Sequence, residues 1–395
     1  MELTELQKKG LEIAVKRYKS GEKYTVIAGY AGSGKSTLVR YIIAALQVPA
    51  TSVAYATPTG KAAEVLRKKG NQNAITLHKL LYKSSLQKDG TYRRFPVKDL
   101  PYQVVVVDEC SMVPQSMVDT LLKHRVYVLF LGDPFQIPPI LKSDENALLQ
   151  TPHIFLSEIM RQAQESEIIQ LTMAIREGKP FGTFKGKEVQ IYNHNELSEG
   201  MLTWADQIIC ATNKTRNMIN NKMRDLQGFS GSPKEGEKLI CLHNYWDIVN
   251  PLGEALVNGT TGFVTNIEKG TVSIPHIRDV KSRDLDVYNF DLETDDADGI
   301  FTDLAMDRNM LETDKYSLSS REEYRLTTTS PYKDTLQLPM QFSYGYAITG
   351  HRAQGSQWDK VLVVEENFPF NAEEHARWLY TCCTRPAQKL VLIRK

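Results

Sequence analysis

Short apolar runs alternate with amphipathic segments over residues 1–150 of the chain. The apolar runs predict β-strands at Tyr24 to Ala28, Ser52 to Ala56, Val104 to Val107 and Val126 to Leu131. Amphipathic segments predict one helix from Lys35 and another over Lys61 to Lys69. Because strands that alternate with helices are typical of a parallel α/β sheet, we predict a first α/β domain over residues 1–152.

The same alternation returns in the second half of the chain. It predicts a helix from Thr215 and strands at Gln207 to Ala211, Lys360 to Val364 and Lys389 to Ile393. Residues of about 266 to 338 break this pattern with short β-like stretches and many acidic side chains. We therefore predict a second α/β domain formed by residues 153–265 and 339–395, interrupted by a small β domain over residues 266–338.

A shorter interruption of the first domain covers residues 82–100. Asp89 and Gly90 lie there between two runs of polar and aromatic residues. An Asp-Gly pair between such runs favours the tight turn of a β-hairpin. The sequence therefore predicts a hairpin insertion in the first domain.

Composition excludes several classes of protein. With 42% hydrophobic and 24% charged residues the chain is ordinary for a globular protein, and no apolar run approaches the roughly 20 residues that span a bilayer. The N-terminus lacks the features of a secretory signal, so we expect a cytoplasmic protein without a membrane segment. Five cysteines without CxxC spacing predict neither disulfides nor a zinc site. The net charge of +1 gives no indication of a nucleic-acid partner.

A glycine-rich segment between the first strand and its helix carries the clearest chemical signal. Residues 29–36 read GYAGSGKS and match the phosphate-loop pattern GxxxxGK[ST] in its required context. The backbone N–H groups of such a loop bind phosphates, its lysine adds positive charge, and its Ser or Thr hydroxyl binds magnesium. The sequence predicts an ATP and Mg²⁺ site that includes Gly29, Gly32, Ser33, Gly34, Lys35, Ser36 and Thr37.

Two acidic residues follow the strand of four valines. A strand that is apolar on both faces belongs in the centre of a parallel sheet, whose carboxyl ends face the ligand crevice. We expect Asp108 to hold magnesium through water and Glu109 to accept a proton from the water that attacks ATP.

Several further segments resemble the conserved motifs of superfamily 1 helicases. DECSM at 108–112 and GDPFQIPP at 132–139 are similar to motifs II and III, and YAITGHRAQGSQ from 346 and LYTCCTRP from 379 are similar to motifs V and VI. ATPTGKAA at 56–63, ITLHKLL at 75–81 and LSEIMRQ at 156–162 resemble motifs Ia, Ib and IV. Their order most resembles the 5′→3′ branch of RecD-like and phage Dda-like helicases. Gly350, Arg352 and Pro386 depart from the pattern, and Pro386 predicts a helix that ends at Arg385.

The resemblance implies two RecA-like domains that share one ATP site, with a pin-like hairpin in the first and an SH3-like β domain inserted in the second. It implies that Gln136 contacts the nucleotide and that Arg161 and Arg385 act as arginine fingers. Gly355 of motif V is placed near the nucleotide. Gln7 resembles the glutamine that reads adenine, although Thr4 and Gln7 also have the spacing of a helix capping box.

The resemblance also implies residues that contact single-stranded DNA. They are Thr57, Pro58, Thr59 and His78 of the first domain and Asn213, Thr349 and His351 of the second. In the hairpin, Tyr92 and Phe95 are candidate aromatic wedges that separate the strands of a duplex. A histidine packed in the core and a plain surface hairpin are the alternatives for His78 and for residues 82–100.

These observations predict an ATP-dependent helicase that moves 5′→3′ on single-stranded DNA and unwinds duplex junctions as a monomer, in bacterial or phage replication, recombination or repair. A single-strand binding protein or replication proteins are candidate partners in a bacterial or phage-infected cell. Three alternatives remain: an ATPase that translocates without unwinding, an RNA helicase, and a P-loop enzyme that is not a motor.

Overall fold

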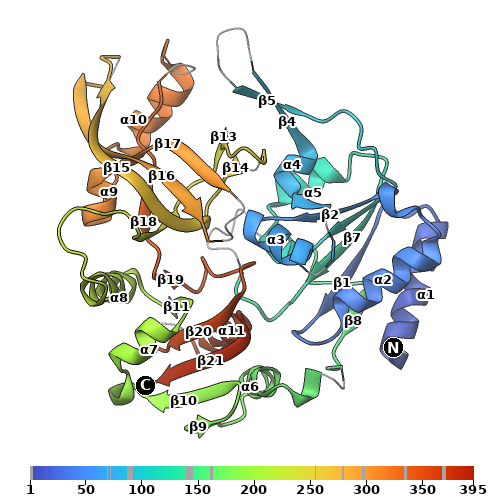
Figure 1. Ribbon diagram of the computed structural model, residues 1–395. Helices are drawn as coiled ribbons and strands as arrows, with labels where there is room; N and C mark the ends of the chain where they lie inside the picture. Colours follow the sequence, from blue (N-terminus) through green and yellow to red (C-terminus); the bar gives the residue numbers. More distant parts are fainter. Residues whose placement is uncertain are drawn as a thin grey trace. The chain divides into compact units, whose positions relative to one another are not determined.

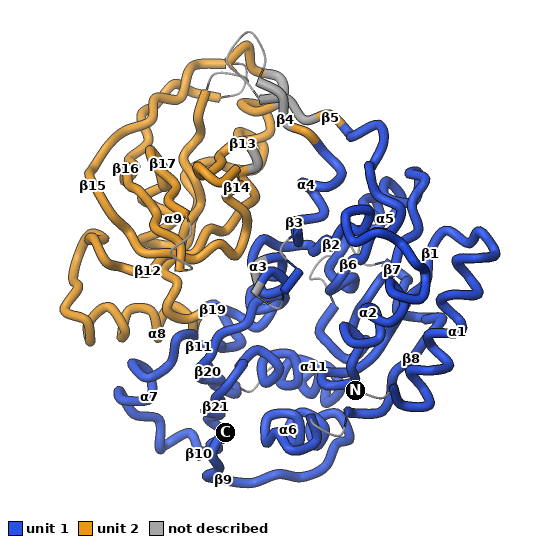
Figure 2. Tube along the Cα trace, turned by 45° about the vertical axis from the view of Figure 1, so that its right-hand side comes forward, with its two compact units in different colours: residues 1–82, 96–213, 348–395 blue, residues 83–95, 214–347 orange. Residues whose placement is uncertain are grey.

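The computed structural model describes residues 3–68, 70–71, 73–86, 92–138, 146–160, 163–253, 255–277, 280–295, 299–332, 336–366 and 371–395. The chain forms two compact units (Figure 2). The first contains residues 1–82, 96–213 and 348–395, and the second contains residues 83–95 and 214–347. Within the described residues, no helix is both long enough and apolar enough to cross a membrane.

The first sheet of the first unit has six strands in the order β3-β2-β6-β7-β1-β8, and every adjacent pair is parallel. The strands are β1 (Tyr24–Gly29), β2 (Val53–Thr57), β3 (Ala74–Thr76), β6 (Val104–Val107), β7 (Tyr127–Gly132) and β8 (Ile154–Leu156). The helices are α1 (Glu5–Lys19), α2 (Lys35–Leu46), α3 (Gly60–Lys68), α4 (Leu77–Leu81) and α5 (Gln115–Leu121), with 3₁₀ turns η1 (Ala50–Ser52) and η2 (Cys110–Met112).

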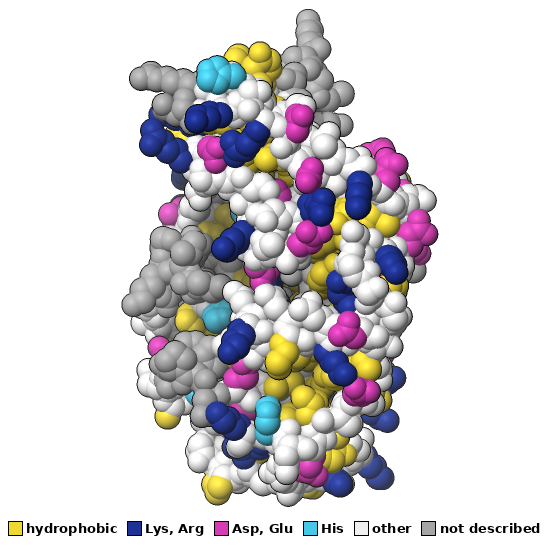
Figure 3. Space-filling model, turned by 90° about the vertical axis from the view of Figure 1, so that its left-hand side faces the viewer, with side chains coloured by type: hydrophobic (Ala, Val, Ile, Leu, Met, Phe, Trp, Pro, Cys, Tyr) yellow, Lys and Arg dark blue, Asp and Glu magenta, His cyan; other side chains and the backbone are white. Residues whose placement is uncertain are grey.

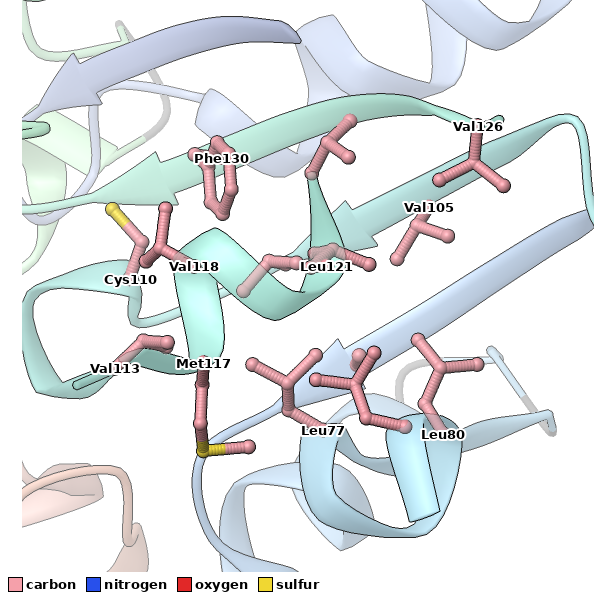
Figure 4. Packing of buried hydrophobic residues seen from close by; sticks show 14 of the residues in the cluster. Leu77, Leu80, Val105, Cys110, Val113, Met117, Val118, Leu121, Val126 and Phe130 are labelled. Atoms are coloured by element: carbon pink, nitrogen blue, oxygen red, sulfur yellow. The ribbon is translucent and has the colours of Figure 1, made fainter. Parts of the chain in front are cut away.

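Alternate residues of these strands point to opposite faces of the sheet, and each face packs against helices. Val104 and Val106 pack with α1 and α2 on one face. Val105 and Val107 pack with α4 and α5 on the other, together with Phe130 and Leu121 (Figure 4). The run of four valines is therefore a central strand buried on both sides, as predicted, and it places Asp108 and Glu109 at the carboxyl edge of the sheet.

The second sheet has the order β19-β11-β20-β21-β10-β9, in which β10, β21, β20 and β11 pair in parallel and the short β9 is antiparallel to β10. Its strands are β9 (Phe184–Lys185), β10 (Val189–Asn193), β11 (Gln207–Cys210), β19 (Ala347–Thr349), β20 (Trp358–Val364) and β21 (Pro386–Arg394). Its helices are α6 (Glu167–Arg176), α7 (Glu199–Trp204) and α11 (Ala372–Cys383), with 3₁₀ turns η4 (Ala163–Glu165) and η5 (His194–Glu196). Helix α8 (Asn213–Leu226) follows β11 and belongs to the second unit from Lys214 onward. Figure 1 shows α11 beside β20 and β21. The α/β fold class is confirmed for both halves of the chain.

An antiparallel sheet in the order β17-β16-β15-β12-β18 forms most of the second unit. Its strands are β12 (Lys238–Cys241), β15 (Thr261–Ile274), β16 (Arg283–Thr294), β17 (Ile300–Asp307) and β18 (Phe342–Tyr344). Beside it lie the pair β13 (Tyr245–Val249) and β14 (Ala255–Leu256), the helices α9 (Arg308–Thr313) and α10 (Ser320–Tyr324), and the π-helical turn η6 (Arg325–Thr329). The likeness of this β domain to an SH3-like fold stays a prediction.

This sheet extends beyond the predicted β insertion of residues 266–338 at both ends. The predicted boundary at residue 266 falls inside β15. This strand continues through an irregularity in its pairing with β16, between Thr265 and Glu268. Asn266 has a left-handed φ of 50° there. A bulge of this kind interrupts the apolar-polar alternation without ending the pairing of the strands, so the sequence pattern predicted short stretches where one 14-residue strand exists.

Strands β4 (Tyr82–Leu86) and β5 (Tyr92–Pro96) form a two-stranded sheet. This is the position of the predicted hairpin. The predicted turn at Asp89 and Gly90 lies outside the described residues, and the role of the hairpin as a pin stays a prediction.

Candidate nucleotide and nucleic-acid site

The phosphate loop connects the end of β1 to the start of α2. Gly32 and Gly34 have left-handed φ values of 76° and 80°, which residues with a side chain rarely adopt. Gly34 is the N-cap of α2, so the first turn of the helix opens directly onto the loop. The unpaired N–H groups and the helix dipole at this end favour an anion.

Contacts inside the loop fit a phosphate ligand. The Lys35 Nζ donates to the carbonyl oxygens of Gly29 (2.7 Å) and Tyr30 (3.1 Å), so the ammonium already lies over the loop. The buried hydroxyl of Ser33 has no hydrogen-bond partner among the described residues. A Cβ at Gly29 would lie 2.5 Å from that hydroxyl oxygen, which leaves room only for glycine. These features suit the triphosphate of a nucleotide. Among the other predicted residues, Ser36 is exposed and Thr37 is half-buried in the first turn of α2.

The two carboxylates follow β6 in an unusual backbone conformation. Glu109 has a φ of 54°, in the left-handed region that costs a residue with a side chain free energy. The Asp108 Oδ1 accepts a hydrogen bond from the Glu109 N–H at 2.9 Å. Downstream, the buried Asn146 donates from Nδ2 to the carbonyl oxygens of Cys110 and Val113, both at 2.7 Å. Asn146 therefore fixes the loop that carries the carboxylates, a role that the sequence did not indicate.

Magnesium would need only a few protein oxygens at this site. As predicted ligands, Ser36 and Asp108 would supply a hydroxyl and a carboxylate, the small ligand set that Mg²⁺ uses when it also binds nucleotide phosphates. Within the described residues, no cluster of three or more His, Cys, Asp or Glu side chains could hold a metal by itself. The residues present therefore fit a magnesium ion that arrives with its nucleotide.

Arg385 of the second sheet reaches the carboxylate of the first. Its Nη1 lies 4.0 Å from the Glu109 Oε1, and its Nε donates to the Thr381 carbonyl at 2.9 Å. Only one orientation of the Gln136 amide satisfies both neighbours: with its nitrogen towards Glu109, the amide can donate to the Glu109 Oε2 (3.3 Å) and accept from the Arg385 Nη2 (3.2 Å). Three predicted site residues therefore form one network. Helix α11 ends at Cys383, two residues before the end that was predicted at Arg385. Pro386 is the first residue of β21.

Gln7 occupies the alternative role that its spacing allowed. Its Oε1 accepts from the Thr4 N–H (3.1 Å) while the Thr4 hydroxyl accepts from the Gln7 N–H (3.3 Å), so the two residues form the capping box of α1. The Gln7 Nε2 faces the Gly34 carbonyl at 3.5 Å and the Met160 sulfur at 3.2 Å. Gln7 is fully buried, and adenine recognition would require its amide to leave the capping box. The adenine contact of Gln7 stays a prediction.

The second predicted arginine finger, Arg161, lies outside the described residues.

The segments that resemble motifs Ia and V lie against each other. Thr57 is fully buried and donates to the Thr59 carbonyl at 2.9 Å, and the Thr59 hydroxyl accepts from the Ala62 N–H at 3.2 Å. Pro58 between them is half-buried. Gly355 has a φ of 73°, and a Cβ there would lie 3.0 Å from the Thr59 hydroxyl. Thr57 thus shapes this loop. The atoms nearest to a Cβ at Gly355 belong to Thr59, Ala62 and Met112, and its place near the nucleotide stays a prediction.

The motif V turn explains one departure from the helicase pattern. A Cβ at Gly350 would lie 2.5 Å from the Trp378 Nε1 and 2.9 Å from the Cys382 sulfur, so α11 fills the space that a larger residue would need. Thr349 and His351 on either side are half-buried. Burial lowers the pKa of His351, so a phosphate contact at neutral pH would be a hydrogen bond from an uncharged ring.

Asn213 is exposed at the start of α8 and is held there by a residue that the sequence did not indicate. The Glu366 Oε2 accepts from the N–H groups of Ala211 (2.6 Å) and Thr212 (3.0 Å). Its Oε1 accepts from the Thr212 hydroxyl at 2.9 Å. Glu366 therefore fixes the loop that presents Asn213.

Of the remaining predicted DNA contacts, His78 on α4 is half-buried with its ring 6.0 Å from that of Tyr82. Phe95 is 48% exposed in β5, as a wedge would have to be. Tyr92 belongs to β5, but its side chain is outside what the structure describes.

Among the residues that the structure describes, no separate basic patch marks the face drawn in Figure 3. On the face drawn in Figure 3, the described Lys and Arg side chains are interspersed with Asp and Glu side chains. This agrees with the net charge of +1, and any contact with a nucleic acid would depend on individual side chains.

Comparison with protein families gives two matches. A model described as an AAA domain matches residues 3–199, and a model described as a UvrD-like helicase C-terminal domain matches residues 344–393. The chain is 25% identical over 386 residues to the ATP-dependent RecD2 DNA helicase of Deinococcus radiodurans, covering 93% of this chain and 46% of the relative. It is 30% identical over 193 residues to the ATP-dependent DNA helicase dda of phage T4, covering 45% of this chain and 43% of the relative.

The chain belongs to the superfamily 1B helicases. The predicted resemblance is thereby confirmed, although the chain spans less than half the length of these two named relatives. Its fold resembles that of a Bacteroides Pif1 in a structure with single-stranded DNA, at 20% identity and a TM-score of 0.50, covering 99% of this chain and 92% of that one.

The helicase motifs contain functional candidates that motif matching alone left without a role. The Tyr380 hydroxyl of motif VI donates to the Asp133 carboxylate of motif III at 2.6 Å. The Thr381 hydroxyl of motif VI accepts from the Ile137 N–H of motif III at 3.0 Å. Because Tyr380 and Thr381 are buried in an amphipathic helix, the sequence pattern marks them as core residues. Only the hydroxyl groups of these two residues indicate that they also form hydrogen bonds with motif III.

Replacing Thr4 or Gln7 by alanine separates capping from adenine recognition. Loss of the N-cap in Thr4→Ala should destabilise the protein by about 0.5–2 kcal/mol, measured as a lower melting temperature, and Gln7→Ala should lower the melting temperature as well. If Gln7 also reads adenine, only Gln7→Ala should reduce the preference for ATP over GTP in steady-state hydrolysis. An unchanged ATP-to-GTP ratio in Gln7→Ala would leave Gln7 with a capping role alone.

Proposed function

We propose that the chain is an ATP-dependent DNA helicase that moves 5′→3′ along single-stranded DNA and unwinds duplex junctions. One observation carries most of this proposal. Glu109 of the first sheet, Gln136 of motif III and Arg385 of the second sheet form one network beside the phosphate loop. A P-loop enzyme that only transfers phosphate has no need for a second α/β sheet to supply an arginine to its ATP site.

The residues of the first sheet would bind and activate the nucleotide. Lys35 and the loop amides bind the phosphates, while Ser36 and Asp108 hold magnesium, which neutralises phosphate charge when bound. Glu109 orients the attacking water and accepts its proton. Gln136 links this carboxylate to Arg385 and so places the water and the arginine in one geometry.

The residues of the second sheet would complete the transition state. Arg385 is buried, and its donors face carbonyl, hydroxyl and amide oxygens, so its positive charge is held in place before the reaction. Arg161 is proposed as the second arginine finger from its motif. Charge that develops on the transferring phosphoryl group would be stabilised by both.

Coupling to a nucleic acid would follow from the contact between motifs Ia and V. The turn that contains Gly355 packs on Thr59, and the same turn carries Gln354, whose amide nitrogen donates to the Ile137 carbonyl of motif III. A shift of the second sheet on ATP binding would therefore move motif V against motif Ia. The two sides would grip the strand alternately and so move it in steps. The gripping residues would be Thr57, Pro58, Thr59 and His78 on one side and Asn213, Thr349 and His351 on the other.

These contacts favour binding without base specificity. Hydroxyl, amide and uncharged imidazole groups position phosphates and sugars without reading bases. RecD2 and dda are named as DNA helicases, which supports DNA over RNA as the substrate. We propose residues 1–152 and residues 153–265 with 339–395 as the two motor domains, residues 82–100 as a pin and the inserted β domain as an accessory. We further propose that the protein acts as a cytoplasmic monomer in bacterial or phage DNA metabolism, alongside single-strand binding or replication proteins.

The first test is whether single-stranded DNA stimulates ATP hydrolysis. We expect stimulation in the wild-type chain and its loss in Lys35→Ala, because the ammonium that binds the phosphates is gone. Lys16→Ala, an exposed lysine in α1, is the matched control and should behave as the wild type. Turnover that ignores DNA would favour a P-loop enzyme that is not a motor, and stronger stimulation by RNA would favour an RNA helicase.

The direction of movement is tested with two partial duplexes of identical sequence. A 5′→3′ motor that loads on single strands should unwind the duplex with a 5′ overhang and leave the one with a 3′ overhang intact. Preference for the 3′ overhang would overturn the proposed direction. Hydrolysis without unwinding of either substrate would favour a translocating ATPase.

The pin assignment is tested with two phenylalanines of equal exposure. Phe95 in β5 and Phe184 in β9 are both 48% exposed. Phe95→Ala should slow unwinding of the 5′-overhang duplex while DNA-stimulated hydrolysis stays at the wild-type rate, because a wedge acts only at the junction. Phe184→Ala should change neither rate. Equal loss of unwinding and hydrolysis in Phe95→Ala would contradict a pin.

A further inference from the structure

The middle of the phosphate loop is held by side chains from helices of the second sheet. The Ala31 N–H donates to the Tyr380 hydroxyl of α11 at 2.9 Å. The Arg176 guanidinium carbon, at the end of α6, lies 3.8 Å from the centroid of the Tyr30 ring. Helices α6 and α11 lie side by side in the first unit (Figure 2). We call Tyr380 and Arg176 the loop clamp.

The Tyr380 hydroxyl belongs to a buried polar chain with a fixed direction. It donates its proton to the Asp133 Oδ2 at 2.6 Å, which leaves its oxygen to accept from Ala31. The Asp133 Oδ1 accepts from the Phe135 N–H at 2.9 Å. Tyr380 is 1% exposed and Asp133 is 3% exposed, and burial raises the pKa of Asp133. Removal of the hydroxyl would take a hydrogen bond from both the Ala31 N–H and the buried Asp133 carboxyl, which costs free energy in a buried place.

The contacts that hold the loop from inside involve the lysine that must bind phosphate. The Lys35 ammonium donates to the carbonyls of Gly29 and Tyr30. A phosphate oxygen is a stronger acceptor for an ammonium than a neutral carbonyl, so a bound nucleotide would draw Lys35 away from residues 29 and 30. The loop clamp contacts residues 30 and 31 without using Lys35. It would therefore hold this segment in place when the internal contacts are lost.

The clamp also joins the loop to the residue that completes the site. Tyr380 and Arg385 belong to one continuous segment of α11 and its C-terminal turn, and the Arg385 Nε donates back to the Thr381 carbonyl. A fixed distance between Ala31 and Tyr380 thus sets where Arg385 lies relative to the phosphates.

We propose that Tyr380, assisted by Arg176, is a positioning residue for ATP hydrolysis that ties the phosphate loop to α11 and so places Arg385. This inference rests on the proposed ATPase function. Tyr380 touches neither the nucleotide phosphates nor the water in this role. Because Arg385 stabilises the transition state, loss of the tie should lower kcat and leave the KM for ATP nearly unchanged.

A purely structural role for Tyr380 would be the docking of α11 onto motif III. Its ring packs edge-on against Phe135 with centroids 5.2 Å apart. The hydroxyl of the neighbouring Thr381 serves that docking, because it accepts from the Ile137 N–H at 3.0 Å. The Thr381 carbonyl, which accepts from the Arg385 Nε, is kept in Thr381→Val. Thr381→Val therefore removes a buried hydrogen bond between the same helix and motif III and is a matched control.

The experiment compares wild type, Tyr380→Phe, Thr381→Val and Arg176→Met in DNA-stimulated ATP hydrolysis over a range of ATP concentrations. Tyr380→Phe should lower kcat between about 10- and 100-fold, the loss expected for a misplaced catalytic group, with KM changed by less than about threefold. Thr381→Val should keep kcat within about threefold of wild type. Arg176→Met should lower kcat in the same direction as Tyr380→Phe, by a smaller factor.

Three results would overturn the inference: wild-type kcat in Tyr380→Phe, an equal loss of kcat in Thr381→Val, or a rise in KM without a loss of kcat. Melting temperatures are measured for all four proteins. If Tyr380→Phe is unfolded at the assay temperature, Arg176→Met decides, and an unchanged kcat there overturns the inference. Absence of DNA-stimulated hydrolysis in the wild type would instead refute the proposed function, so the two failures are distinguishable.

Discussion

The face of α11 that packs on motif III joins the two halves of the candidate ATP site, and Tyr380 on this face is the contact on which the geometry of the site depends. Arg377 donates to the Pro134 carbonyl at 3.0 Å, Tyr380 to Asp133, and the Thr381 hydroxyl accepts from Ile137. Positions three and four residues apart lie on one side of a helix, so these residues form a single stripe. The stripe holds two sheets together where each alone has an incomplete site: the first lacks an arginine at Glu109, and the second lacks a phosphate loop.

Close approach between the two sheets requires glycine on both sides of this contact. A Cβ at Gly32 would lie 3.1 Å from the Ala163 Cβ, and the Met160 N–H donates to the Gly32 carbonyl at 3.0 Å. Gly355 makes the corresponding approach to Thr59. The loop glycines thus serve two purposes, because they allow the backbone to curl around phosphate and also admit a neighbouring segment. Movement between the sheets would change the surroundings of the phosphate loop and of motif V together.

Much of the fold and of the ATP site could be predicted from the sequence because both depend on local patterns. The four valines of β6 predicted a central strand, and the GYAGSGKS segment predicted the loop and the start of α2 at Lys35. The insertion was harder to predict, because the bulge after Thr265 broke the alternation in a strand that continues. The role of Gln7 could not be decided from the sequence either, since the same side-chain amide can complete a capping box or bind adenine. The strand-contact candidates rest on motif position, and Thr57 shows how a motif residue can be fully buried.

The residues that the sequence did not reveal share one physical property. Each is a polar side chain that forms a hydrogen bond with a backbone group far away in the chain: Tyr380 with Ala31, Asn146 with Cys110, and Glu366 with Ala211. A backbone N–H or carbonyl exists at almost every position, so no pattern of residue types marks it as a partner. Each of these side chains fixes a loop that carries a candidate functional residue. The catalytic groups of such a site are therefore visible as motifs, whereas the groups that hold their loops in shape become visible only when the backbone is in place.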